Sequence, residues 1–283
     1  AETAALSETL GRPLTLIAES DLNDPRTVTP RSEHGLGMDA QWSDDLHHAI
    51  HVRLTGETDG YYADFAAPGA LAKTLRGAFF HDGSWSSFRE RSHGRPVDVA
   101  SVPGSAFLAY VQNHDQIGNR ATGDRISASV SPGLIACGAA IVLLGPYTPM
   151  LFMGEEWAAS TPWQFFASFP DPDLADAVRN GRRKEFGRHG WGESEVPDPM
   201  DEATFRRSKL DWRELKHPDH ANILELHKSL IALRREFPEL SDPSLANFRV
   251  EVADDDSWIV MHRGRFQVRV DFAEGAIDVT SAD

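Results

Sequence analysis

Two carboxylates in this sequence stand where the apolar runs before them end. Glu19 follows the run LTLIA directly, and Asp115 follows the run FLAYVQ after two further polar residues. Such a pair can hydrolyse a glycosidic bond, because a protonated carboxyl group donates to the leaving oxygen while an ionised one stabilises the oxocarbenium-like transition state. We interpret Glu19 and Asp115 as candidates for these two tasks. For Glu19 taken alone, a solvated loop acid is an equally good interpretation.

The two acids have surroundings of different polarity. The apolar neighbours of Glu19 are expected to bury its carboxyl group and to favour the protonated form, whereas the donors beside Asp115 favour an ionised carboxylate. Asn113 and His114 stand directly before Asp115, and three adjacent polar groups at a strand end need partners or a ligand. We interpret His114 as a donor to a sugar hydroxyl rather than a core histidine. No second His or Cys stands near it at a ligand spacing, so we predict no metal and no cofactor.

Tryptophans could supply the flat apolar surfaces that stack on sugar rings. Four of the seven tryptophans lie at strand ends or in polar segments: Trp42, Trp85, Trp157 and Trp163. Each alone is more simply a packing residue, but several on loops at one face would form a sugar-binding rim.

Parallel strands must position these side chains. Apolar runs bounded by Gly, Pro and polar residues predict strands over residues 14–18, 37–42, 107–112 and 150–154. Helices are predicted over residues 44–56, 68–80, 133–145, 173–186 and 220–237, the first of them capped by Ser43. Strands and helices alternate, which indicates parallel strands whose C-terminal ends carry the chemistry. Residues 81–103 are rich in Gly, Ser and Pro and are predicted to form a long loop.

The pattern of the sequence changes near residue 240. Beyond Pro243, apolar and polar residues alternate between Asp and Gly turns, as in a small antiparallel sheet. We therefore predict two domains, residues 1–240 and residues 241–283.

Composition and charge narrow the classes of partner. The chain has 283 residues, of which 41% are hydrophobic and 25% charged, as is typical of globular proteins. Its net charge of −15 repels phosphate backbones, so we predict no nucleic-acid partner. No apolar stretch is long enough for a membrane span, and no membrane partner is predicted. The single cysteine, Cys137, is interpreted as a small buried filler, and the absence of an internal disulfide fits a cytoplasmic location.

Four strings of the sequence carry a resemblance to a known family: LIAESDLNDPR, GMDAQWSDDLHHAIHVRLTGE, YVQNHDQIGNR and PMLFMGEEW. They resemble maltooligosyltrehalose trehalohydrolases, which are members of the α-amylase superfamily (glycoside hydrolase family 13). The resemblance covers essentially the whole chain. It implies an α/β fold that consists of the C-terminal half of a (β/α)8 TIM barrel, strands five to eight, followed by a small antiparallel β domain.

The resemblance also implies an activity and site residues. Such enzymes cleave the α-1,4-glucosidic bond next to the terminal trehalose of maltooligosyl trehalose, an α-glucan substrate, and release trehalose. By this resemblance Glu19 is the general acid/base and Asp115 the transition-state stabiliser. The implied substrate-binding residues are His114, Asn113, Gln116, Asp39, Gln41, Trp42, Glu155 and Glu156.

One departure from the family pattern concerns the nucleophile. The family carries it as an aspartate in a stretch resembling R-x-D-A-hydrophobic-H, and no such stretch precedes Glu19 here. Retaining hydrolysis needs two carboxyl groups about 5–5.5 Å apart, one of which attacks the anomeric carbon. We therefore expect the chain to be a C-terminal fragment that is inactive alone and needs the N-terminal half of the barrel as its partner.

Two other functions remain open from the sequence. A glycogen-branching or amylase-type enzyme of the same superfamily would share both acids but form different products. A non-catalytic glucan-binding protein on a degenerate barrel would account for the missing nucleophile, but it has no reason to keep the two acids.

Overall fold

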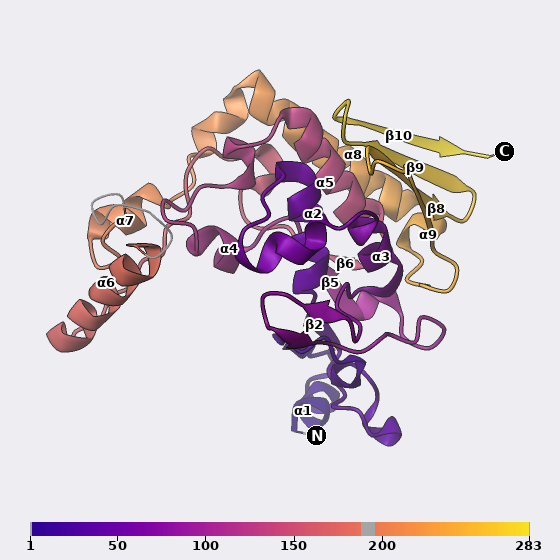
Figure 1. The fold of residues 1–283 in the computed structure, drawn as a ribbon, viewed down its shortest axis with the longest axis horizontal. Helices are drawn as coiled ribbons and strands as arrows, with labels where there is room; N and C mark the ends of the chain where they lie inside the picture. The colour runs from indigo at the N-terminus through magenta and orange to yellow at the C-terminus, as the bar shows by residue number, and fades with distance from the viewer. Residues whose placement is uncertain (1, 188–195, 283) are drawn as a thin grey trace. The chain divides into compact units, whose positions relative to one another are not determined.

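The structure is a computed structural model that describes residues 2–187 and 196–282. It divides into two compact units. Unit 1 comprises residues 1–111, 136–150 and 230–283, and unit 2 comprises residues 112–135 and 151–229. Figure 1 shows the elements in chain order. The domain boundary expected near residue 240 stays a prediction.

Unit 1 contains the parallel sheet that the sequence predicted. Its strands run in the order β1-β2-β5-β6, and every pairing is parallel. Their bounds are Ile17–Ala18 for β1, Ala40–Trp42 for β2, Phe107–Ala109 for β5 and Thr148–Pro149 for β6. Consecutive parallel strands of this kind form part of a barrel sheet, so the predicted fold class of a partial barrel is confirmed.

The strands are shorter than the apolar runs, and the last one is displaced from its predicted position. The prediction of a strand over residues 150–154 is wrong, because β6 pairs through Thr148 and Pro149 with β5. Pro149 is tolerated since β6 is an edge strand of the described sheet, where a residue without an N–H group breaks no ladder. One further bond, from Met150 N to Ala109 O at 2.9 Å, closes the pairing.

Helix α2 (Asp44–Thr55) packs its apolar face into unit 1. The predicted cap is confirmed, since Ser43 Oγ accepts from Leu46 N at 3.4 Å. Gly56, in the left-handed region at φ 72°, ends the helix. Nine of the twelve residues of α2 are buried, including three histidines. The helix therefore fixes the position of the polar residues in its first turn.

The remaining helices of unit 1 are short. The α-helices are α1 (Glu2–Leu10), α3 (Ala70–Gly77) and α9 (Pro238–Ser241). The 3-10 helices are η1 (Pro25–Thr27), η2 (Arg31–Glu33), η3 (Gly60–Ala66) and η4 (Gly104–Ala106). Helix α3 does not begin at Pro68 as predicted. Gly69 at φ 74° cannot continue a right-handed helix, and its N–H donates instead to the carboxylate of Asp256 at 2.9 and 3.1 Å. The predicted loop 81–103 contains a hairpin of β3 (Trp85–Ser86) and β4 (Arg91–Ser92).

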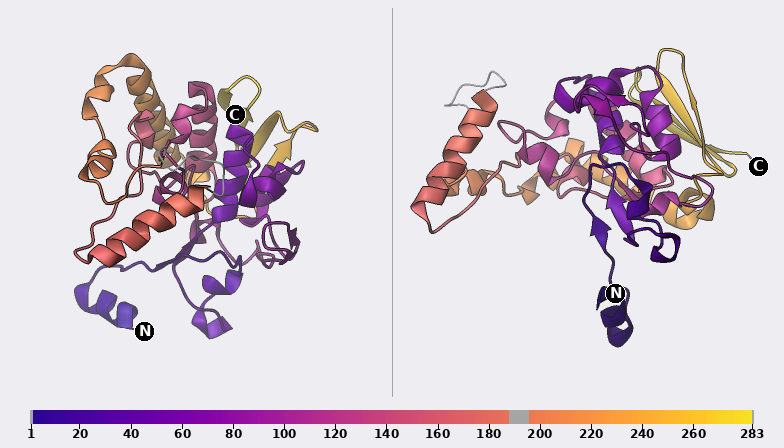
Figure 2. Two further views of the ribbon diagram at one scale, coloured as in Figure 1. Left: turned by 60° about the vertical axis from the view of Figure 1, so that its left-hand side comes forward. Right: turned by 60° about the horizontal axis from the view of Figure 1, so that its bottom comes forward.

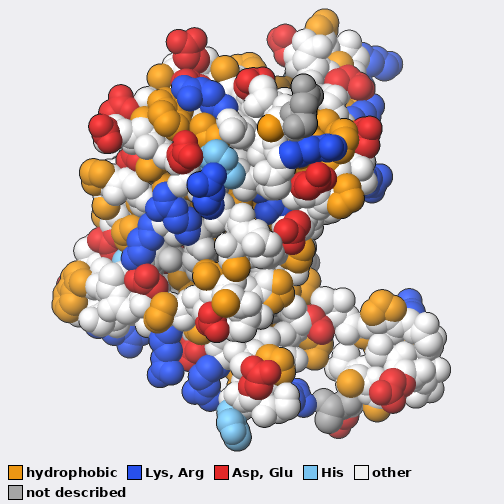
Figure 3. Space-filling view, turned by 90° about the vertical axis from the view of Figure 1, so that its right-hand side faces the viewer, with side chains coloured by type: hydrophobic (Ala, Val, Ile, Leu, Met, Phe, Trp, Pro, Cys, Tyr) orange, Lys and Arg blue, Asp and Glu red, His pale blue; other side chains and the backbone are white. Residues whose placement is uncertain are grey.

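The predicted antiparallel sheet closes unit 1 as a meander in the order β10-β9-β8-β7. Its strands are Arg249–Val252, Trp258–Arg263, Phe266–Asp271 and Ala276–Ser281 for β7 to β10. They form one twisted sheet in both views of Figure 2. In β9, buried residues such as Val268 and Val270 alternate with more exposed ones, as predicted. Figure 3 shows Lys and Arg side chains beside acidic ones on one face.

Unit 2 consists of short helices joined by long irregular segments. Its own helices are α4 (His114–Gly118), η5 (Ile126–Ala128), η6 (Glu155–Trp157), α6 (Pro172–Gly187), α7 (Glu202–Arg207) and η7 (Trp212–Lys216). Helices α5 (Pro132–Leu144) and α8 (Pro218–Glu236) have residues in both units. Arg125, which is buried, connects irregular segments by donating to Thr161 O at 2.7 Å and Met153 O at 2.9 Å.

None of the helices in residues 2–187 and 196–282 has the length and the apolar character that crossing a bilayer requires.

Candidate functional site

Glu19 follows β1 directly and lies in unit 1. The residue before it, Ala18, is opposite Gln41 of β2, so the backbone at Glu19 is held by the sheet on one side. Its side chain is exposed. Within the described chain, the apolar neighbours of Glu19 do not bury its carboxyl group as expected, because Leu16 and Ile17 are themselves largely exposed. A carboxylate at this position is open to a substrate.

Three further predicted site residues lie on or beside β2 in unit 1. Asp39 precedes the strand, and its Oδ2 accepts from Leu16 N at 2.7 Å. This bond fixes the register at the start of β1, three residues before Glu19. The side chain of Trp42 packs edge to face on Tyr110, with ring centroids 5.2 Å apart.

Gln41 carries the least satisfied side chain of this group. It is only 1% exposed, and neither its Nε2 nor its Oε1 has a hydrogen-bond partner within the part of the chain that the structure describes. A buried amide without partners is costly, on the order of 1–3 kcal/mol for each group. Its substrate-binding role stays a prediction, and its unused donor and acceptor are compatible with one.

Exposed aromatic side chains gather near the hairpin of unit 1, and only one of them, Trp85, was predicted from the sequence. Tyr61 and Phe88 meet edge to face with centroids 5.8 Å apart, and Phe88 is 56% exposed. Trp85, on β3, is 62% exposed. Exposed rings of this kind suit stacking on sugars. The Tyr61-Tyr62 pair and the Phe88-Arg89 pair were the sequence signals that could have indicated this surface.

The predicted residues of the Asn113-His114-Asp115 string lie together in unit 2. Asn113 is buried and caps α4, because its Oδ1 accepts from Asp115 N at 2.8 Å and Gln116 N at 3.3 Å. His114 and Asp115 are both exposed in the first turn of this short helix. The Oε1 of Gln116 is buried and has no partner among the described residues. The cap therefore orients the helix that carries Asp115.

Asp115 has a partner that sequence reasoning missed. Asn119 donates from Nδ2 to Asp115 Oδ1 at 2.8 Å, one helical turn further along the chain. Asn119 Oδ1 in turn accepts from Arg182 Nη1 at 3.1 Å, and Arg182 also donates to Gly118 O. The guanidinium of Arg182 lies 4.6 Å from the ring centroid of Phe165. The i, i+4 spacing of Asp115 and Asn119 was a usable signal, whereas the distant Arg182 gave none.

Glu155 and Glu156 have different environments in unit 2. Glu155 is buried, and burial raises the pKa of its carboxyl group to about 8, although hydrogen bonds with the Phe152 backbone and with Gln112 oppose the shift. Its Oε2 has no partner among the described residues. Glu156 is half-buried and accepts from Gly154 N at 2.9 Å. Substrate binding by either residue stays a prediction, and at neutral pH the Glu155 carboxyl group is largely protonated.

Two of the tryptophans act as packing residues. Trp157 is buried, donates to Glu214 Oε2 at 3.2 Å and packs on Trp212 with centroids 4.9 Å apart. Trp163 packs on Phe152 and Phe166. The packing interpretation is therefore correct for these two residues, in contrast to the exposed Trp85.

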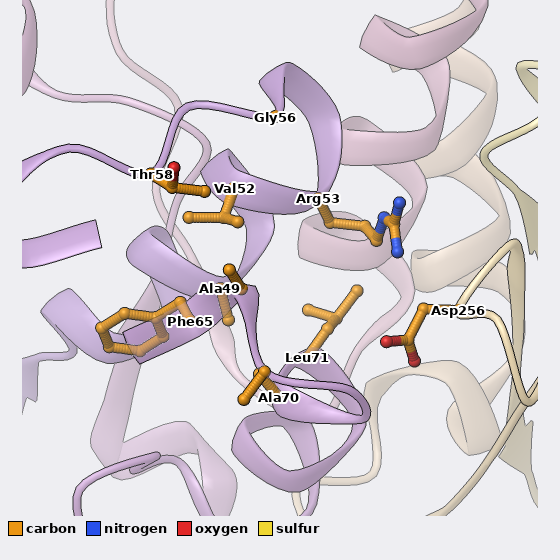
Figure 4. A pocket seen from close by; sticks show the side chains of 11 residues that line it. Ala49, Val52, Arg53, Gly56, Thr58, Phe65, Ala70, Leu71 and Asp256 are labelled. Atoms are coloured by element: carbon orange, nitrogen blue, oxygen red, sulfur yellow. The ribbon is translucent and has the colours of Figure 1, made fainter. Parts of the chain in front are cut away.

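A cavity in unit 1 lies apart from the predicted site residues. Figure 4 shows Val52, Phe65 and Leu71 around it, with Arg53 and Asp256 at one side. None of the predicted acids lines it. The described residues also contain no cluster of His, Cys, Asp and Glu that could hold a metal ion.

The parallel sheet and the antiparallel sheet that follows it place the chain in the α-amylase-type class of folds. A solved structure assigned as an α-amylase from Salmonella typhimurium matches with a TM-score of 0.83 and 35% identity. The match covers 95% of this chain and 47% of that one. At this identity and overlap, both the fold and the sequence connect the chain with the α-amylase superfamily.

The curated relatives define the family more narrowly. The malto-oligosyltrehalose trehalohydrolase of Rhizobium sp. (strain M-11) is 57% identical over 275 residues, which is 97% of this chain and 46% of the relative. That of Arthrobacter ramosus is 60% identical over 233 residues, 82% of this chain and 40% of the relative. The chain thus belongs to the malto-oligosyltrehalose trehalohydrolase family, as the resemblance implied, and spans about half the length of the curated relatives it matches. No family profile matches it.

Proposed function

We propose that this chain supplies two of the three catalytic carboxylates of a retaining glycoside hydrolase that releases trehalose from maltooligosyl trehalose. Glu19 is the general acid/base and Asp115 the transition-state stabiliser. The single observation that carries the proposal is that both acids stand exposed after parallel strands, in a chain 57% identical to a protein named as such a hydrolase. The cytoplasmic location stays a prediction.

The chemistry assigns one proton transfer to Glu19 in each half of the reaction. Glu19 first donates its proton to the glycosidic oxygen while the bond from the anomeric carbon to that oxygen breaks. A third carboxylate, for which no stretch of this sequence before Glu19 resembles the family's nucleophile motif, attacks the anomeric carbon and forms the covalent glycosyl ester. Glu19 then takes a proton from the water that cleaves this ester. Asp115, ionised, stabilises the positive charge that develops in both transition states.

The exposed aromatic surface supports a sugar substrate rather than a charged one. Tyr61, Trp85 and Phe88 offer ring faces without a charge of their own, and Arg89 nearby is paired with Asp21 at 3.1 Å. Pyranose rings present apolar faces of matching size. Trehalose at the end of a glucan chain would place such faces against this surface.

The test uses the protein encoded by the complete reading frame that contains this sequence, and compares it with two variants. Glu19→Gln and Asp115→Asn keep the shape of each side chain and remove its acid. We expect the unchanged protein to release trehalose from maltooligosyl trehalose, and each variant to lose several orders of magnitude in turnover, at least about a thousandfold. The 283-residue chain alone serves as a second comparison and is expected to be inactive.

The other candidate functions are distinguished by the same assay. Transfer of a glucan segment to a new position, or release of maltose without trehalose, would replace the proposal by a branching or amylase-type activity. Binding of the substrate with no hydrolysis at all would replace it by a glucan-binding function.

A further inference from the structure

A buried carboxylate in the first turn of α2 connects segments far apart in the sequence. Asp45 is 3% exposed, and its Oδ2 accepts three hydrogen bonds. The donors are Asn23 Nδ2 at 2.8 Å, Phe80 N at 2.8 Å and His81 N at 2.9 Å. Asn23 Nδ2 also donates to His81 O at 3.1 Å. One oxygen atom therefore joins α2, the loop after β1 and the segment after α3.

The loop after β1, residues 20–24, is held a second time by the hairpin segment, residues 81–95. His93, which is buried, has its Nε2 2.7 Å from Asp21 O. Arg95 N donates to Asn23 O at 2.9 Å. Arg89 Nη2 donates to Asp21 Oδ2 at 3.1 Å. Together with the bond from Asn23 Nδ2 to His81 O, four hydrogen bonds thus join Asn23 and Asp21 to this segment, in addition to the bond from Asn23 to Asp45.

Glycine at position 94 allows the two segments to approach. A side-chain Cβ at Gly94, whose φ is 76°, would lie 1.8 Å from His81 O and 2.9 Å from Asn23 Cβ. Neither the space nor the backbone conformation admits another residue without movement. The close approach is therefore a built feature of the fold rather than a chance contact of two surface loops.

Glu19 lies between the two places where its backbone is fixed. On one side Ala18 pairs with Gln41 of β2, and on the other Asp21 is bound by His93 and Arg89. Only Glu19 and Ser20 separate these attachments. The direction of the Glu19 side chain therefore depends on the loop conformation that the buried carboxylate stabilises.

We propose that Asp45 is a positioning residue that sets the conformation of loop 20–24 and thereby the direction of the Glu19 carboxyl group. This inference rests on the proposed function for its consequence in catalysis, but the positioning itself is a property of unit 1. Burial raises the pKa of Asp45 to about 6, although its three hydrogen bonds lower it, so the group is largely ionised at neutral pH. An ionised acceptor in a dry site binds N–H donors strongly.

The experiment compares Asp45→Ala with Asp45→Asn, which keeps an acceptor oxygen. Asp256→Ala is the matched control for a general loss of stability, since Asp256 also binds a backbone N–H in unit 1, that of Gly69. Amide hydrogen exchange of residues 20–24 is measured in the 283-residue chain. Values of kcat and KM for trehalose release are measured in the product of the complete reading frame.

We expect Asp45→Ala to accelerate exchange at residues 20–24 at least about tenfold and to lower kcat by a similar factor with KM nearly unchanged. Asp45→Asn should restore both within about threefold, and Asp256→Ala should change neither. Unchanged exchange at residues 20–24 in folded Asp45→Ala, or equal effects of Asp45→Ala and Asp256→Ala, would overturn the inference. Failure of the unchanged protein to hydrolyse any glucan would instead overturn the proposed function, while the exchange measurement would still test the positioning.

Discussion

Asn119 Nδ2 lies 2.8 Å from Asp115 Oδ1 and donates a hydrogen bond to it. The same amide group uses its oxygen to accept from Arg182 of α6 at 3.1 Å. The carboxylate proposed as transition-state stabiliser is thus oriented through an amide that is itself oriented by a cation.

Removal of this amide should impair catalysis more than folding. In the product of the complete reading frame, we expect Asn119→Ala to lower kcat for trehalose release about tenfold, because Asp115 loses the donor that orients it. Steady-state kinetics check this result. Asn180→Ala, an exposed asparagine on α6, serves as the control and should leave kcat unchanged. Equal kcat values for Asn119→Ala and the unchanged protein would show that Asp115 needs no such support.

The raised pKa of Glu155 should make the free energy of unfolding decrease as the pH rises. Its pKa in the folded chain, about 8, lies above the ordinary value of 4.5 because of burial. The folded state therefore holds a proton that the unfolded state releases, and the stabilisation is complete below 4.5 and is lost as the pH rises through 8. The change is on the order of 5 kcal/mol for a shift of this size. Denaturant unfolding of the chain at several pH values, compared with Glu155→Gln, measures it, and identical pH slopes would contradict the prediction.

Two buried histidines of α2, His47 and His48, should make stability change with pH in the opposite direction. Burial lowers the pKa of His48 from 6.5 to about 3 and that of His47 well below 6.5. The unfolded chain takes up protons below pH 6.5 that the folded chain does not, so stability decreases as the pH falls from 6.5 toward 3. Over this range His48 contributes at most about 1.4 kcal/mol per pH unit.

Comparison with His48→Phe isolates the contribution of one ring, because phenylalanine can stack on Tyr61 as His48 does at 4.8 Å. The variant should show a shallower loss of unfolding free energy under acid than the unchanged chain. His34→Phe, at an exposed position, is the control and should keep the full slope. A His48→Phe slope as steep as that of the control would be evidence that His48 is charged in the folded state.

Cys137 should be unreactive in the folded chain. It is fully buried, and burial with the nearby Asp271 carboxylate raises the pKa of its thiol to about 11. A thiol-specific reagent at mildly alkaline pH should therefore label the native chain only at the rate at which it unfolds. Labelling should be complete in concentrated guanidinium chloride, and Cys137→Ser should give no signal. Rapid labelling of the native chain would contradict the burial of this side chain.

The arrangement of the fold was largely predictable, because hydrophobic runs and caps are local properties. Ser43 indicated the start of α2, and the alternation of apolar and polar residues indicated the C-terminal sheet. The strand after Pro149 was misplaced since Met150 to Gly154 is apolar without pairing beyond Met150, and apolar character does not specify partners. The hairpin within residues 81–103 was missed for a similar reason, as only a few backbone bonds define it.

The candidate site was predictable where a side chain follows a strand, and not where contacts join distant segments. Glu19 and Asp115 were selected from their position after apolar runs, and their roles stay a prediction. Nothing near Asp45 in the sequence indicates that Asn23 and His81 converge on it, 22 and 36 residues away. The burial expected for Glu19 was wrong for the described chain, because neighbours in sequence are not neighbours around a side chain.

The capping role of Asn113 limits what this residue can offer a sugar. Its carbonyl oxygen is committed to two backbone N–H groups of α4, which leaves the NH2 group for outside contacts. Asn113 can therefore only donate a hydrogen bond to a sugar hydroxyl, whose oxygen accepts it. Asp at this position would still cap the helix, but its free oxygen would accept a hydrogen bond from the hydroxyl instead. Exchanging the NH2 group for an oxygen would therefore swap donor and acceptor in the contact with the sugar without changing the cap.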